Sequence, residues 1–266
     1  IATIKNKGVL FMKQISVVED TLALAYNKML VEFDKFIEED PEGHRLPCAA
    51  YNTSRYSAMG TMTVLHPLND PMISMCGIHD PRSLQQYIME MLDGILDFEV
   101  EKGNWKYTYH DRMVTPVNQI QAVVDELKKD LYSRRAVICI RSLDDVGSDD
   151  PACLQHIQFI YDKNALNMYV MFRSNDLAKA TFMNAYALIR LGEKICNEVG
   201  VPMGAYIHTA NDLHVYEQDV NAVKEYTKRL EKNPDACCTD FEDNWDGLME
   251  DEIESIWKQV ELLKHQ

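Results

Sequence analysis

The chain is organised around residues 151–216, which open with Pro151-Ala152-Cys153-Leu154-Gln155-His156-Ile157-Gln158-Phe159. Two further runs follow, Arg173-Ser174-Asn175-Asp176 and then Asn211-Asp212-Leu213-His214-Val215-Tyr216. Together they gather a thiol, a guanidinium, carboxylates and a histidine–tyrosine pair in a short part of the chain. We therefore predict a single pocket in which an anion is held close to a reactive sulfur.

Apolar periodicity around this stretch predicts helices and strands in mixed order. Helices are expected at residues 17–39, 81–93, 114–131, 178–199, 219–232 and 250–263. Strands are expected at 61–66, 105–110, 136–140, 156–161, 166–172 and 203–209, and loops at 51–60, 143–150 and 233–247. The aromatic segment 105–110 is also a candidate pocket wall. Because strict βαβ alternation is missing, we expect a single α+β domain over residues 1–266.

Composition restricts the class of protein. The chain has 266 residues, of which 46% are apolar, so it can bury a sizeable core. It contains neither a run of about 18 apolar residues nor a secretory signal pattern at its start. The seven cysteines are an odd number without metal-ligand spacing, which favours free thiols and no metal site. We therefore expect a cytoplasmic protein.

The formal net charge of -15 disfavours nucleic acid and anionic membranes as partners. A phosphorylated ligand would require arginines to be concentrated locally against this overall field. Each arginine alone is also compatible with a solvated surface position. The candidates for an anion site are Arg45, Arg55, Arg134, Arg135 and Arg173.

The order and spacing of the run around Cys153, the run 173–176, Asn184 and the run 212–216 resemble the thymidylate synthase family. The details are most similar to the shorter archaeal-type members and to related nucleotide hydroxymethylases. The resemblance covers about residues 51–219, with residues 220–266 as a helical extension. It implies a large twisted mixed sheet flanked by helices, and a back-to-back homodimer.

The resemblance also implies roles for the reactive and phosphate-binding residues. Cys153 would attack carbon 6 of a pyrimidine as a thiolate, with Arg173 as the stabilising cation. Arg173 and Ser174 would hold the nucleotide phosphate together with Arg55, because guanidinium forks suit oxyanions. Arg134 and Arg135 would reach the same phosphate from the second subunit.

Further residues would recognise the sugar, the base and the folate. His214 and Tyr216, which share one face of an extended segment, would bind the ribose 3'-hydroxyl. Asn184 would pair with the N3–H and O4 edge of uracil, where the cytosine-specific hydroxymethylases have an aspartate. Asp176 would engage the folate pterin and support proton transfer, and Gln158 is expected to face the pocket. These residues fit ribose and deoxyribose nucleotides alike.

The catalytic glutamate of the family is the main departure. A gapless alignment after Arg82-Ser83 puts Tyr87 at its position, and Glu90 follows one turn later. Glu90 lies at the edge of an apolar stripe, where burial would raise its pKa and suit it to proton transfer. A solvated glutamate is the alternative.

Three functions remain open from the sequence. The first is a methyltransferase of nucleotide biosynthesis that moves a one-carbon unit from 5,10-methylenetetrahydrofolate to C5 of dUMP, giving dTMP. The second is a pyrimidine nucleotide hydroxymethylase, in which water quenches the reaction. The third is an inactive nucleotide-binding paralogue, against which the retained Cys153 argues.

Overall fold

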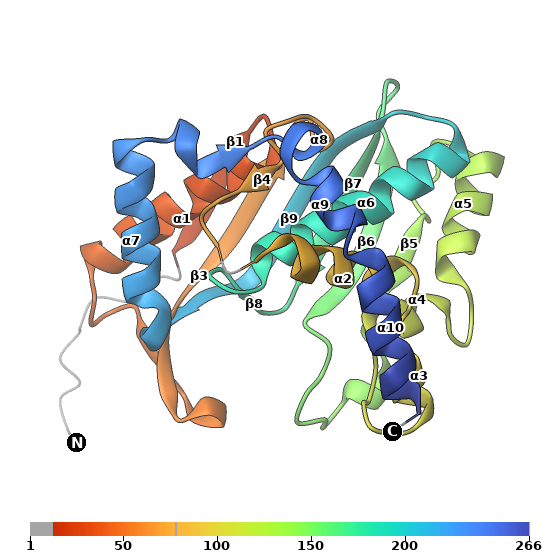
Figure 1. Ribbon diagram of the computed structural model, residues 1–266, viewed down its shortest axis with the longest axis horizontal. Helices are drawn as coiled ribbons and strands as arrows, with labels where there is room; N and C mark the ends of the chain where they lie inside the picture. Colours follow the sequence, from red (N-terminus) through yellow and green to blue (C-terminus); the bar gives the residue numbers. More distant parts are fainter. Residues whose placement is uncertain (1–12, 78, 266) are drawn as a thin grey trace, which may run out of the picture.

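The computed structural model describes residues 13–77 and 79–265, without the side chain of Ala50 (Figure 1). The strands are β1 (Gln14–Glu19), β2 (Arg45–Cys48), β3 (Thr53–Val64), β4 (Ile73–Ser74), β5 (Val137–Cys139), β6 (Leu154–Tyr161), β7 (Leu166–Phe172), β8 (Asn175–Asp176), β9 (Met203–Tyr216) and β10 (Cys238–Thr239). The helices are α1 (Leu22–Glu39), α2 (Pro81–Leu92), α3 (Phe98–Glu101), α4 (Tyr109–Val114), α5 (Gln119–Lys129), α6 (Thr181–Val199), α7 (Val220–Lys232), α8 (Phe241–Asn244), α9 (Asp246–Glu250) and α10 (Ile253–Lys264).

In the described part of the chain, eight strands form one mixed sheet in the order β1-β3-β9-β7-β6-β5, with β2 beside β3 and β8 beside β9. β1 runs parallel to β3, and β7 and β8 run parallel to β9. The pairs β3–β9, β6–β7 and β5–β6 are antiparallel. The expected large mixed sheet flanked by helices is confirmed.

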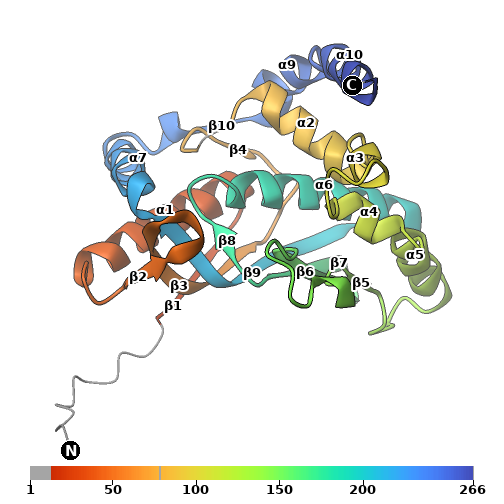
Figure 2. The ribbon, with the colours of Figure 1, turned by 90° about the horizontal axis from the view of Figure 1, so that it is seen from below.

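The two faces of the sheet differ. Side chains alternate along β3, so that Tyr56, Ala58 and Met62 are buried while Ser57 and Thr61 are partly exposed. The buried set faces the helices. No described helix covers the other face, which lies at the bottom of Figure 2. One face therefore carries the core and the other remains available.

Helices α1 and α6 cover the inner face, with α6 crossing the middle of the sheet (Figure 1). Their buried residues include Tyr26, Phe33 and Tyr186, which belong to one continuous apolar core. Helix α6 ends at Gly200, whose φ of 84° is the left-handed conformation that glycine adopts without strain. The first turn of α6 follows β8 closely in the chain and so lies beside it.

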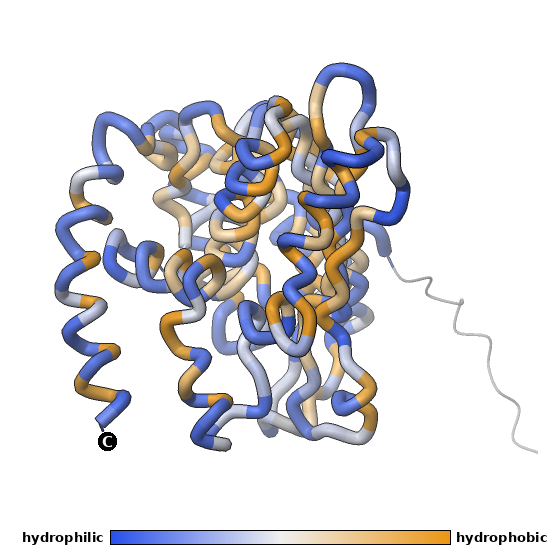
Figure 3. The backbone as a smooth tube through the Cα atoms, turned by 90° about the vertical axis from the view of Figure 1, so that its right-hand side faces the viewer, coloured by the Kyte–Doolittle hydropathy of each residue, from blue (hydrophilic) through white to orange (hydrophobic). Residues whose placement is uncertain are grey.

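Helix α2 packs on α6, and α9 and α10 pack on α2 as an outer layer. Helix α10, at the left edge of Figure 3, alternates hydrophilic and hydrophobic residues. Its Ile256 and Val260 pack with Met89, Ile95 and Leu96 in a small second apolar cluster. Among the described residues, no helix has both the length and the hydrophobicity to cross a bilayer.

Several predicted elements were wrong in extent or type. The expected helix at 17–39 begins only at Leu22, because Val17 and Val18 alternate between buried and exposed in β1. The expected loop at 51–60 lies mostly in β3, whose polar residues occupy the uncovered face. Strand β9 continues past residue 209 to Tyr216, because it pairs with both β3 and β8 there.

The expected strand at 105–110 was also wrong. The Thr108 side chain accepts a hydrogen bond from the Asp111 backbone N at 2.9 Å and so begins α4 instead. The expected helix at 114–131 starts only at Gln119, where Asn118 accepts from the Gln121 backbone N at 3.0 Å. The segment 233–247 contains β10 and α8 rather than being irregular throughout.

Because α1 packs in the core, truncation of its buried side chains should destabilise the protein. Phe33 is fully buried and packs edge-on against Phe36, with ring centroids 5.3 Å apart. Phe33→Ala should lower the free energy of unfolding by about 3–5 kcal/mol, measured by urea denaturation. Leu24, on the same helix but 38% exposed, is the control, and Leu24→Ala should cost less than about 1 kcal/mol. Equal losses would contradict this packing.

Candidate functional site

A cavity of about 680 Å³ opens where the ends of β3, β8 and β9 meet the first turn of α6. Eight of the predicted site residues line it: Arg55, Cys153, Arg173, Ser174, Asp176, Asn184, His214 and Tyr216. Its remaining lining includes Tyr87, Tyr109, Asp150, Lys179 and Asp212. The structure therefore gathers residues from 55 to 216 in one place.

Strand pairing brings the separate runs together. In β3–β9, Arg55 lies opposite Tyr216, and in β8–β9, Asp176 lies opposite His214. Arg55 also binds Asp212, with 3.0 Å between Nη2 and Oδ2, while the Ser57 hydroxyl donates to Asp212 Oδ1 at 2.5 Å. Asp212 was not predicted as a site residue, although its position two residues before His214 was a usable signal.

Cys153 lies immediately before β6 and is held by the chain segment that carries Arg173. The Arg173 backbone N donates to the Cys153 carbonyl at 2.9 Å. Its guanidinium donates to the carbonyls of Pro151 and Ala152 at 2.6 and 3.0 Å. Burial raises the pKa of the Cys153 thiol, and the charge of Arg173 partly opposes that rise. In the protein without a ligand, Cys153 is therefore mainly in the protonated thiol form.

Asp176 sits at the end of β8, where its carboxylate accepts from the backbone N of Ala178 and Lys179 at 2.9 and 3.1 Å. Burial raises its pKa, against the opposing effect of His214. The Ser174 hydroxyl lies 3.4 Å from His214 Nδ1. This side of the cavity can hold a proton on a carboxyl close to hydroxyl and imidazole groups.

Tyr87 and Asn184 form the opposite wall. Helix α2 begins where the Asp80 carboxylate accepts from the Ser83 backbone N at 2.9 Å, and its face toward α6 carries Tyr87. The Tyr87 hydroxyl donates to Asn184 Oδ1. Burial raises the pKa of Tyr87 well above its usual range, so this phenol remains a hydrogen-bond donor.

A second cavity of about 560 Å³ adjoins the first and shares Tyr87, Tyr109 and Asp150 with it. Its other walls combine the apolar or aromatic residues Met91, Leu96, Trp105 and Tyr107 with the polar residues Glu90, Asn104, Lys106 and Thr108. Residues 105–109 of the aromatic segment line this cavity, as expected of a pocket wall, whereas His110 lines neither cavity.

Glu90 lies in this second cavity rather than beside Cys153. It accepts from Gln86 Nε2 at 2.9 Å, and burial raises its pKa as the sequence suggested. Its catalytic role remains a prediction.

The structure does not bring Gln158, Arg134 and Arg135 to the Cys153 cavity. Gln158 alternates with buried residues along β6, so it lies on the uncovered face, where its Nε2 donates to the Arg134 carbonyl at 3.1 Å. Arg135 is exposed and binds Glu126, with 2.7 Å between Nη2 and Oε1. Within one chain these three residues belong to the outer surface.

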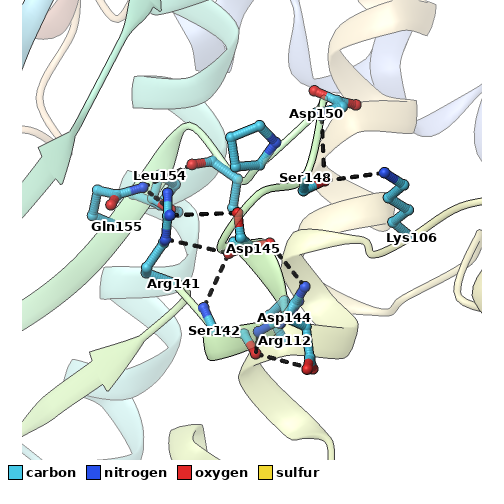
Figure 4. Close-up of polar contacts among 12 residues, drawn as sticks. Lys106, Arg112, Arg141, Ser142, Asp144, Asp145, Ser148, Asp150, Leu154 and Gln155 are labelled. Carbon is cyan, nitrogen blue, oxygen red and sulfur yellow. Dashed lines mark hydrogen bonds and ion pairs between the residues drawn. The ribbon is translucent and has the colours of Figure 1, made fainter.

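A buried carboxylate fixes the loop that leads to Cys153 (Figure 4). Asp145 accepts from the Ser142 backbone N at 3.0 Å and from Arg112 Nη2 at 3.1 Å, and Arg141 Nε lies 3.8 Å away. Arg112 belongs to α4, the helix that begins at Tyr109. The Asp145 network thus links the loop before the thiol to a helix that lines both cavities.

Comparison with known proteins agrees with this architecture. The model of the family described as thymidylate synthase matches residues 85–253. The chain belongs to the thymidylate synthase family. The match begins later than expected from the sequence and continues into the C-terminal helices.

Three relatives, all named "Putative thymidylate synthase", support the assignment to the thymidylate synthase family. The protein from Methanocaldococcus jannaschii is 35% identical over 160 residues, which are 54% of this chain and 68% of that protein. The Methanosarcina mazei protein is 31% identical over 154 residues, covering 55% and 67%. The Methanothermobacter marburgensis protein is 29% identical over 131 residues, covering 48% and 59%.

The environment of Cys153 predicts its reactivity. Because burial raises the pKa of this thiol, its alkylation rate in the free protein should rise with pH to a midpoint above about 8.5, the ordinary thiol value. Arg173→Gln should move the midpoint higher by removing the positive charge, while Arg173→Lys should move it less. Peptide-resolved mass spectrometry of iodoacetamide labelling measures both. A midpoint below the ordinary value would contradict the burial argument.

Proposed function

We propose that this member of the thymidylate synthase family transfers a one-carbon unit from 5,10-methylenetetrahydrofolate to C5 of dUMP, giving dTMP. One observation carries the proposal. The Cys153 thiol, the Asn184 carboxamide and the anion-binding groups Arg173 and Ser174 all line a single cavity of nucleotide-sized volume, about 680 Å³.

The residues of the cavity suit attack on a pyrimidine. The Cys153 thiolate forms a bond to C6, and the electrons of the C5–C6 double bond move toward O4, which makes C5 nucleophilic. Asn184 offers a donor to O4 as charge develops there. Loss of the C5 proton then breaks the bond between the one-carbon unit and its carrier and leaves an exocyclic methylene on C5. Addition of a hydride to this methylene re-forms the C5–C6 double bond and expels the Cys153 sulfur from C6.

Two carboxyl groups are available for proton transfer. Asp176 lies in the Cys153 cavity, and burial raises its pKa, which suits a group that takes up and releases a proton. Glu90 lies in the second cavity and would act from that side. His214 and Tyr216, on the same strand as Asp212, would bind the 3'-hydroxyl of the sugar.

The second cavity fits a folate. Its aromatic and apolar walls suit a flat ring system, and Glu90 provides a polar group within it. Trp105, Tyr107 and Met91 would hold the ring, while Asp176 would meet its pterin from the first cavity. When bound, the folate supplies the one-carbon unit and, for thymidylate, the reducing hydride.

A second copy of the chain would complete the phosphate site. Three cations of the cavity, Arg55, Arg173 and Lys179, face four carboxylates. Arg55 is engaged by Asp212, and Arg173 by backbone carbonyls. A phosphate therefore needs further positive charge, which Arg134 and Arg135 of a back-to-back homodimer would add across the uncovered face of the sheet.

We also propose that residues 1–266 form one domain with residues 220–266 as its helical extension. In support, apolar residues of α7 and α9 join the core that packs on the sheet. A cytoplasmic location is proposed on the free state of all seven cysteines.

A hydroxymethylase of the same family is the second candidate. The observation that favours it is Tyr87, a phenol beside Asn184 at the position aligned with the family's catalytic glutamate. At that wall the neutral phenol of Tyr87 replaces the family's carboxyl group. The steps after transfer of the one-carbon unit would then end with addition of water rather than hydride.

Product analysis separates the candidates. Incubation with dUMP and 5,10-methylenetetrahydrofolate should give dTMP and dihydrofolate by mass spectrometry, whereas hydroxymethyl-dUMP with tetrahydrofolate would establish the second candidate. Cys153→Ser should abolish turnover and retain nucleotide binding, because the hydroxyl is a much weaker nucleophile. A fluorinated dUMP analogue should trap Cys153 covalently, and its failure to do so in the folded protein would indicate an inactive binding protein.

The second-subunit role of Arg135 can be tested separately. Arg135→Ala should weaken dUMP binding by about 1.5–3 kcal/mol, the value of a charged hydrogen bond, in isothermal titration. Arg229→Ala, which removes the same charge from exposed α7, is the control and should have little effect.

Mixing Arg135→Ala with Cys153→Ser chains should restore activity, because one site of each mixed dimer then has both an intact thiol and an intact partner arginine. No restoration in verified mixed dimers would contradict sharing of the site.

A further inference from the structure

We propose that Tyr87 is a specificity-determining residue, which fixes the orientation of the Asn184 carboxamide and thereby sets the preference between uracil and cytosine nucleotides. The proposal rests on the proposed function for the class of ligand. It assigns a role to a side chain that the resemblance left without one.

The contact joins two helices across the cavity wall. Tyr87 lies on α2 and Asn184 in the first turn of α6, and the Tyr87 hydroxyl donates to Asn184 Oδ1. The backbone of Asn184 is fixed as well, since its N donates to the Ala180 carbonyl at 2.9 Å. Both side chains line the cavity of Cys153. The orientation of the carboxamide therefore depends on its own torsion and on Tyr87.

The nitrogen of the carboxamide remains available for a ligand. Among the described residues, none accepts a hydrogen bond from Asn184 Nδ2. This nitrogen is also not one of their fully buried polar atoms without a partner. Nδ2 is therefore accessible to the cavity. A ligand meets a donor at Nδ2 beside an oxygen that already accepts from a phenol.

The two ends of a carboxamide recognise different pyrimidines. Uracil presents the N3–H donor and the O4 acceptor, whereas cytosine presents the N3 acceptor and the N4 amino donor. Binding both bases equally well would require the carboxamide of Asn184 to turn by about 180°. A group that holds one orientation therefore discriminates between the two.

Tyr87 opposes this turn. Its phenol stays protonated, because burial raises its pKa well above the usual range. After the turn, the phenol oxygen would accept from Nδ2, and its own hydrogen would have no acceptor among the described residues. The turn would exchange the hydrogen bond to Oδ1 for one from Nδ2 and leave the phenol hydrogen unpaired, which disfavours the turned state.

Other polar side chains near this wall are engaged elsewhere. The Tyr109 hydroxyl accepts from the Leu154 backbone N at 3.4 Å. Glu90 is bound by Gln86 in the adjoining cavity. In the part of the chain that the structure describes, Tyr87 is the side chain that forms a hydrogen bond with the Asn184 carboxamide.

The test compares dissociation constants of dUMP and dCMP, measured by isothermal titration with the intact protein. Tyr87→Phe keeps the ring and removes the hydroxyl, so the preference between the two nucleotides should narrow by about three- to tenfold, the value of one hydrogen bond. Tyr186→Phe is the matched control. Tyr186 follows Asn184 on α6, but its hydroxyl lies outside the Cys153 cavity and accepts from Arg190 at 3.1 Å. The ratio of the dUMP and dCMP dissociation constants should therefore not change in Tyr186→Phe.

A second variant tests whether Tyr87 acts through Asn184. In an Asn184→Ala background no carboxamide remains to be oriented, so Tyr87→Phe should leave the ratio unchanged. An unchanged ratio for Tyr87→Phe alone, in protein whose unfolding temperature is preserved, overturns the proposal. So does an equal shift in both backgrounds.

Failure of the proposed function has a different signature. A wild-type protein that prefers dCMP would overturn the assignment of dUMP, and narrowing of that preference by Tyr87→Phe would still support the orienting role. Equal affinity of the wild-type protein for the two nucleotides would overturn the orienting role even where dUMP is converted to dTMP.

Discussion

The pairing of β9 with β3 on one side and β8 on the other is the constraint on which the site depends. Its register places Tyr216 opposite Arg55 and His214 opposite Asp176. The Arg55–Asp212 ion pair ties the same two long strands together at this end. Because a slip by one residue would turn each of these side chains to the other face, the apolar alternation of β3 and β9 also fixes the chemistry of the cavity.

The charge distribution adds a second condition. The chain carries a net charge of -15, and the guanidinium groups within the cavity are already engaged by Asp212 and by carbonyls of the Cys153 loop. The phosphate of the nucleotide proposed as ligand would therefore have to compete for these donors or receive others from outside. Positive charge that could supply such donors is exposed on Arg134 and Arg135, next to the edge strand β5. These two arginines lie beside the face of the sheet that no described helix covers.

Much of this could be predicted from the sequence. The buried strand β7 and the strongly apolar helix α6 have clear patterns, and the runs around Cys153, Arg173 and His214 meet in one cavity. Polar β3 was missed because one of its faces lacks a covering layer, so its composition is that of a loop. Gln158 was misplaced because alternation along β6 does not reveal which face is covered. The contact between Tyr87 and Asn184 depends on how α2 and α6 pack, which no local pattern encodes.

The Asp145 network has a consequence for redesign of this enzyme family. A single buried carboxylate joins the loop ahead of Cys153 to the helix that begins at Tyr109. The Cys153 cavity and the adjoining aromatic cavity are thus mechanically coupled through a residue that lines neither of them. Attempts to remodel the aromatic wall would therefore also displace the Cys153 sulfur, unless Arg112 and Asp145 are kept as a unit.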